Sequence, residues 1–137
     1  MATHLADALA NRGYRNIQSI AEGGAGKIYC GKKDGENVRF KISCHSRKAS
    51  SPRYLIQILV GALKNVDRFI FWFESEDYFY DIPAKWLIHI FDNEGDNVKI
   101  RGAQWLVNLT LDTGDFDLPR SENSWNLKKY RCPVNTA

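Results

Sequence analysis

Two runs of alternating residues, joined by Asp34-Gly35, constrain this chain more than any other part of its sequence. The runs extend from Lys27 to Lys33 and from Glu36 to Cys44, and the dipeptide between them suits a two-residue turn in which both residues take positive φ. In the second run one set of residues alternates with another: Val38, Phe40, Ile42 and Cys44 with Arg39, Lys41, Ser43 and His45. Because side chains alternate across a strand, we predict a β-hairpin with the first set toward the core and the second set on the other face.

The remaining sequence predicts further helices and strands within one domain, residues 1–137, which is an ordinary size for a single core. Apolar residues at helical spacing, with suitable ends, predict helices at 3–12, 54–64 and 83–91, and a short helix within 120–129. Aromatic and β-branched runs predict strands at 17–20, 67–73, 78–82, 98–101 and 105–111. This order is typical of an α/β fold with a mixed central sheet flanked by helices.

Several absences bear on the location of the protein. The three cysteines, Cys30, Cys44 and Cys132, have no CxxC spacing and are odd in number, which argues against a disulfide framework or a zinc ribbon. The first residues do not form a signal peptide, and no apolar run reaches the length of a membrane span. We therefore expect a cytoplasmic protein with no membrane partner.

Charge is distributed unevenly although the formal net charge is only +3. Residues 37–66 contain no acid and six Lys or Arg residues, whereas residues 67–96 contain eight acids and only two basic residues. A basic face is the electrostatic signature of phosphate binding, and the alternative is a solvated loop that happens to be rich in Lys and Arg. The acidic stretch offers a second surface, suited to a protein partner.

The order of these elements resembles the PD-(D/E)XK nuclease superfamily over roughly residues 3–91. In that superfamily a helix precedes a strand that bears Asp, and a second strand bears Glu-x-Lys, as the strand with Lys41 does in part. The aromatic strand Asp67–Phe73, a second strand, and Ile82-Pro83 opening a helix add to the likeness. The resemblance implies a restriction-endonuclease-like fold and an endonuclease, a hydrolase that cleaves DNA phosphodiester bonds with Mg²⁺ held by carboxylates.

The likeness is incomplete at the residues that would hold the metal. Lys41 matches the lysine of the superfamily, but Arg39 occupies the position of its Glu, and residues 27–29 supply no Asp. One solution is a relocated carboxylate, for which Glu22 is the first candidate as metal ligand and catalytic partner of Lys41, and Asp7, Asp34 and Glu36 are further candidates. The other solution is an inactive site in a fold that still binds nucleic acid.

These alternatives give the functional hypotheses. The first is a nuclease-fold protein that binds nucleic acid, expected to be DNA, and that cuts it only if the Mg²⁺ site exists. The side chains expected to hold nucleic acid are Arg39, His45, Arg47, Lys48 and Arg53. The resemblance also implies a homodimer, by analogy alone. The second hypothesis is a non-catalytic interaction protein, of the kind found in phages and mobile elements, that binds a protein partner through residues 67–96.

Overall fold

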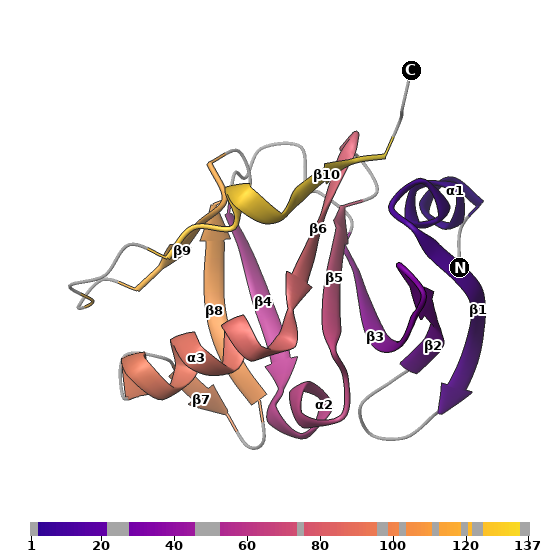
Figure 1. Ribbon diagram of the computed structural model, residues 1–137. Coiled ribbons are helices and arrows are strands. Elements are labelled where there is room, and N and C mark those ends of the chain that lie inside the picture. The colour runs from indigo at the N-terminus through magenta and orange to yellow at the C-terminus, as the bar shows by residue number, and fades with distance from the viewer. Residues whose placement is uncertain are drawn as a thin grey trace.

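The computed structural model describes residues 3–21, 28–45, 53–73, 76–95, 99–101, 104–110, 113–118, 121 and 125–134. Its largest element is a six-stranded mixed sheet with the order β1-β2-β3-β5-β6-β10 (Figure 1). The strands are β1 (Tyr14–Ala21), β2 (Ile28–Lys33), β3 (Glu36–His45), β5 (Arg68–Phe73), β6 (Tyr78–Pro83) and β10 (Arg131–Pro133). Neighbouring strands are antiparallel except β3 and β5, which are parallel. The predicted mixed sheet is thus confirmed.

The predicted β2–β3 hairpin is confirmed, although Cys44, expected to face the core, is exposed. Asp34 and Gly35 have φ of 52° and 85°, and Lys33 pairs with Glu36 across the turn. On β3, Val38 and Phe40 are buried against α1 (Thr3–Asn11), so this helix covers one face of the sheet. The side chains that alternate with them, Arg39, Lys41 and Ser43, therefore lie on the opposite face.

A second sheet packs on that opposite face, together with α2 (Val60–Lys64) and α3 (Ala84–Glu94). Its strands are β4 (Arg53–Leu59), β7 (Lys99–Arg101), β8 (Gln104–Thr110) and β9 (Asp115–Asp117), with β8 paired to the other three. Ile56 and Ile58 of β4 are fully buried and join one core with Phe69 and Phe71 of β5. The chain is therefore mixed α/β and rich in sheet, and a second sheet takes much of the place that flanking helices were expected to fill.

The predicted helix at 54–64 is wrong. Residues 53–59 form β4, which pairs with β8 along its whole length, and only Val60–Lys64 are helical. The apolar residues between 54 and 60 fit both helical and strand spacing, and hydrogen bonding to β8 stabilises the strand. At the chain end, the short helix predicted within 120–129 is reduced, among the described residues, to the 3₁₀ turn η2 (Lys128–Tyr130), which β10 follows; Asn126 instead forms a bridge with Asp115. Among the described helices, none has the length and apolar character needed to span a bilayer.

A buried polar network joins three strands on the α1 side of the large sheet. The side chain of Asp81 has no exposed surface, and its oxygens accept hydrogen bonds from Tyr14 Oη and Arg68 Nε, both at 2.8 Å. Arg68 also donates from Nη2 to the backbone oxygen of Asp81 at 3.1 Å. Burial and the adjacent carboxylate raise the pKa of Tyr14 far above its ordinary value, so its hydroxyl remains protonated.

Candidate nucleic-acid interface

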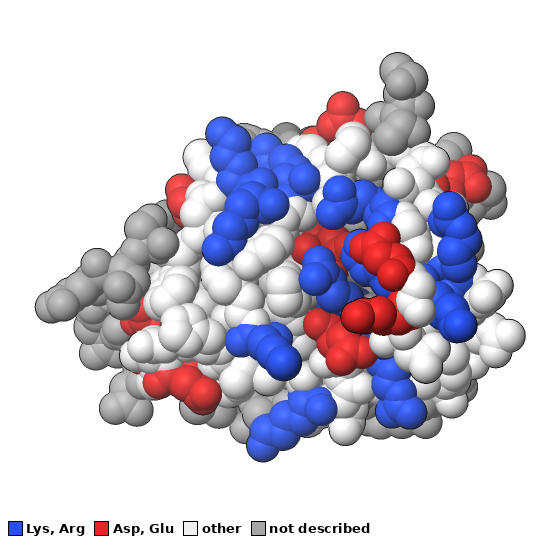
Figure 2. Space-filling model, viewed as in Figure 1, with Lys and Arg blue, Asp and Glu red and all other residues white. Residues whose placement is uncertain are grey.

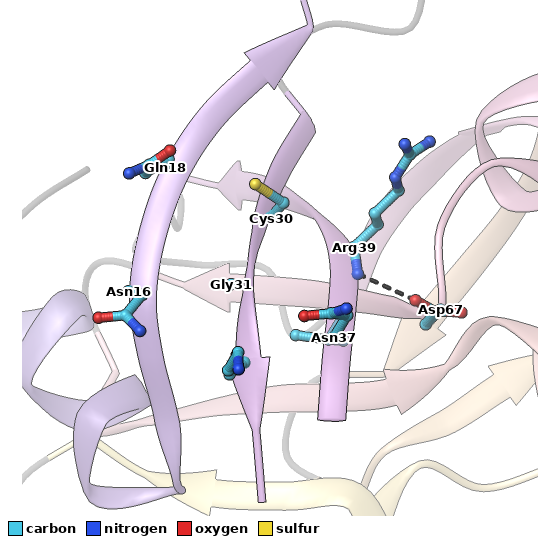
Figure 3. Close-up of a pocket in the computed structure, with 9 residues that line it drawn as sticks. Asn16, Gln18, Cys30, Gly31, Asn37, Arg39 and Asp67 are labelled. Carbon is cyan, nitrogen blue, oxygen red and sulfur yellow. Dashed lines mark hydrogen bonds between the residues drawn. The ribbon is translucent and has the colours of Figure 1, made fainter. Parts of the chain in front are cut away.

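The large sheet is only partly covered on the face that carries Arg39. Over β1, β2 and β3 a row of cross-strand neighbours, Gln18, Cys30 and Arg39, lies along a groove of about 510 Å³ (Figure 3). Lys32 and Asn37 form the next row, and both are exposed. Since the exposed Arg39 belongs to this face, the strands present a polar surface with cationic groups and amides, which we call the hairpin face.

Lys41 stands on the same face but in a different environment. Its cross-strand neighbours are Ile28 on β2 and Phe69 on β5, both of which are buried. Burial lowers the pKa of the Lys41 amine below its ordinary value. The lysine predicted to be catalytic is therefore half-buried between two apolar cross-strand neighbours.

Asp67, a carboxylate that lies beside Arg39, has a structural role. Asp67 accepts a hydrogen bond at Oδ2 from the backbone N–H of Arg39 at 2.9 Å, and its own N–H donates to the Arg39 oxygen at 2.8 Å. These bonds fix the start of β5 beside β3. The other sequence candidates lie elsewhere, since Asp7 is on α1, Asp34 is in the turn, and Glu36 alternates with the hairpin-face residues. Within the described ranges, no group of three His, Cys, Asp or Glu residues is suited to hold a metal ion.

The structure places the remaining predicted residues unevenly. Glu22, Arg47 and Lys48 lie outside the described residues, so the relocated metal ligand and the centre of the basic loop are not placed. His45 is the last residue of β3 and pairs with Phe73. Arg53 begins β4 and therefore belongs to the other sheet. Of the predicted set, the structure brings Arg39 and Lys41 together on one face.

The described acids of the stretch at 67–96 do not form one continuous surface. Asp81 and Glu94 are buried, and each accepts hydrogen bonds inside the protein. Asp67, Asp77 and Asp92 are exposed, but they lie before β5, before β6 and near the end of α3. On the side of the molecule seen in Figure 2, acidic and basic side chains are intermixed near the middle.

Sequence reasoning missed the β1 side of the hairpin face. The predicted strand at 17–20 is part of a longer strand, and Asn16, which lines the groove, has a φ of 58° beside a register shift. Positive φ is uncommon outside glycine, although Asn tolerates it better than most residues. Gly31 permits the close approach of β1, because a Cβ at that position would lie 2.7 Å from the backbone oxygen of Arg15. Asn16 and Gly31 are the residues whose types could have indicated this part of the surface from the sequence.

Comparisons with known proteins add no family to this geometry: no protein-family model, no curated protein and no solved structure matches the chain.

Proposed function

We propose that this chain is a nucleic-acid-binding protein with a nuclease-like α/β fold, which holds the phosphates of DNA on the hairpin face without cutting them. The observation that carries the proposal is that Arg39 and Lys41 share one face of β3, where Arg39 lines an open groove together with Lys32 and amide side chains. Two cations on one strand face attract phosphate, and they repel the divalent ion that nuclease chemistry requires.

The nuclease-like part of the proposal draws support from the order of elements. A helix, a meander of three strands with Lys41 on the third, an aromatic strand, a further strand and a helix after Pro83 follow one another as in the PD-(D/E)XK superfamily. The departure is at residues 53–64, where that superfamily has a helix and this chain has β4 and the short α2.

Arg39 and Lys41 contribute differently to the proposed phosphate binding. The exposed Arg39 guanidinium presents a planar fork that matches two phosphate oxygens. The Lys41 ammonium is partly desolvated, and an approaching anion would favour its protonated form. Arg39 therefore accounts for long-range attraction, and Lys41 for a short-range contact on the same face of β3.

Binding of a labelled DNA duplex, measured by fluorescence anisotropy across a salt series, tests the proposal. We expect Arg39→Ala to weaken binding about threefold to tenfold and to reduce the salt slope by about one phosphate contact. Lys64→Ala is the matched control, because it removes one exposed cation at the end of α2. Equal affinities for the two variants would remove the hairpin face from the interaction.

Plasmid nicking with Mg²⁺ separates binding from catalysis. The proposal expects no nicking above that of the buffer. Mg²⁺-dependent nicking that is lost in both Lys41→Ala and Glu22→Gln would refute the non-cutting proposal and establish Glu22 as the relocated ligand. Sedimentation of the same samples tests whether the homodimer implied by the nuclease resemblance forms.

A further inference from the structure

In Figure 1, β10 lies beside β6 at the edge of the large sheet farthest from β1. Aromatic and basic side chains of β6, α3, η2 and β10 come together at this edge. Figure 2 shows Lys and Arg side chains concentrated over this segment. We call the group the C-terminal aromatic–basic surface, and its members are Tyr78, Trp86, Trp125, Lys128, Lys129, Tyr130 and Arg131. Lys128 and Lys129 are exposed, and the other five are half-buried.

The rings and cations are in direct contact. Lys129 Nζ lies 5.1 Å from the ring centroid of Trp86 and 5.0 Å from that of Tyr130, and these two rings meet edge to face at 5.1 Å. The guanidinium carbon of Arg131 lies 4.3 Å from the centroid of Tyr78. Lys128 and Arg131 also line a hollow of about 420 Å³ with Tyr78. Cationic groups thus lie next to half-buried rings at two neighbouring places.

Hydrogen bonds hold the segment that carries these residues. Trp125 Nε1 donates to the buried carboxylate of Glu94 at 2.5 Å. Asn126 Nδ2 donates to Asp115 Oδ1 at 2.5 Å, and the Lys128 backbone N–H donates to Asn126 Oδ1 at 2.7 Å. Because the backbone is fixed before any ligand arrives, a ligand that binds there avoids much of the cost of ordering it.

We propose that the C-terminal aromatic–basic surface binds single-stranded nucleic acid, with a base stacked on Trp86 or Tyr130 and phosphates held by Lys128, Lys129 and Arg131. A cation over a partly exposed ring is a weaker contact than a stacked base, so a base displaces Lys129 from the rings and leaves its ammonium to meet a phosphate. The inference rests on the proposed nucleic-acid binding and deepens it, because stacking requires bases that a duplex keeps paired.

An acidic protein segment is the competing occupant. It would use the cations but would gain no comparable contact from the rings, since carboxylates do not stack as bases do. The surface offers three cations from Lys128 to Arg131 together with four half-buried rings, and nucleic acid engages both kinds of group.

The test uses the full chain and labelled oligo(dT) of about twelve nucleotides, within the usual length of a single-strand site. The charge-reversed variant Lys128→Glu/Lys129→Glu should bind it about tenfold more weakly than the matched control Lys64→Glu/Lys85→Glu, which reverses two exposed lysines elsewhere. Thermal melts identify any variant that fails to fold. Affinities equal to the control would overturn the inference.

Intrinsic tryptophan fluorescence gives a second readout, which reports stacking itself. Oligo(dT) should quench the emission, and the quench should fall in Trp86→Phe but persist in Trp72→Phe, because Trp72 packs against the core on the α1 side. A quench that is unchanged in Trp86→Phe would overturn the inference. Displacement of oligo(dT) by an equal concentration of poly-glutamate would also overturn the inference, because it would indicate a protein partner.

Arg39→Ala distinguishes failure of this inference from failure of the proposed function. If Arg39→Ala weakens duplex binding while the Lys128→Glu/Lys129→Glu variant binds oligo(dT) like its control, only the aromatic–basic surface is refuted. If Arg39→Ala leaves duplex binding unchanged while the Lys128→Glu/Lys129→Glu variant binds oligo(dT) more weakly than its control, the hairpin face is refuted and the aromatic–basic surface stands. If the protein binds neither nucleic acid, both are refuted.

Discussion

Removal of one hydroxyl group tests the buried network that anchors the large sheet. In Tyr14→Phe the ring remains, but Asp81 loses the hydrogen bond that it accepts from Tyr14 Oη at 2.8 Å. The Asp81 side chain has no exposed surface, so water cannot replace the missing donor. A buried hydrogen bond to a charged group contributes ~1.5–3 kcal/mol. We expect the free energy of unfolding to fall by that amount.

Thermal and urea unfolding, followed by circular dichroism at neutral pH, measure the loss. For a chain of this length, ~1 kcal/mol corresponds to roughly 4 °C, so Tm should fall by about 6–12 °C. The same network predicts an alkaline effect. Because the folded-state pKa of Tyr14 is raised above that of the unfolded chain, stability is fully present below the ordinary tyrosine pKa and decreases as pH rises through it. Tyr14→Phe should flatten that part of the stability curve.

Tyr29→Phe is the matched control. Tyr29 is half-buried with its ring stacked on Phe40 at 5.6 Å, and its hydroxyl has no hydrogen-bond partner within the described ranges. Its free energy of unfolding should change by less than ~0.5 kcal/mol. Equal stabilities of the Tyr14 and Tyr29 variants would refute the reasoning. Asp81→Asn should cost more, ~3–5 kcal/mol, because the half-buried Arg68 would lose its charged partner.

Three further predictions concern Lys41, the carboxyl of Asp115 and the reactivity of the cysteines. Lys41→Met should weaken DNA binding at neutral pH, because it removes one of the two cations that share the face of β3; an unchanged affinity in the anisotropy assay would contradict this. Asp115 has a pKa lowered by its hydrogen bond from Asn126, so it contributes stability above the ordinary carboxyl pKa that is lost as pH falls through the lowered one. In Asn126→Ala, the free energy of unfolding should therefore fall less steeply as the pH is lowered, which acid unfolding measures. An acid unfolding curve equal to that of the unsubstituted chain would count against this. Burial raises the pKa of Cys132, whereas Cys44 is exposed, so a thiol reagent should label Cys44 first and Cys132 only with unfolding, as peptide mass spectrometry can establish.

Local chemistry made the hairpin and α3 predictable. Asp34-Gly35 adopts the left-handed backbone that its residues favour, and the helix after Pro83 begins where proline suits it. The strand at 54–59 was not predictable, because Ile56 and Ile58 belong to an apolar run that fits both periods. Its conformation depends on β8, about fifty residues later, which no local pattern reports.

The two candidate surfaces also differ in how far the sequence could predict them. Arg39 and Lys41 lie two residues apart on one strand, so alternation alone predicted their common face. The aromatic–basic surface combines Trp86 of α3 with Tyr130 of η2, whose rings meet, and Tyr78 of β6 with Arg131 of β10; only the tertiary fold shows these contacts. The environment of Lys41 was equally hidden, since its apolar neighbours come from β2 and β5.

The parallel pairing of β3 with β5 has a consequence for how the protein can be divided. The connection between these strands contains β4, and β4 finds its hydrogen-bonding partner in β8, after α3. Each sheet is thus completed by chain that belongs to the other, and the two are interlocked in sequence. A fragment that ends after α3 would leave β4 as an unpaired apolar edge, which is a template for aggregation. We therefore expect the two sheets to fold in one cooperative step and to resist separation into working halves.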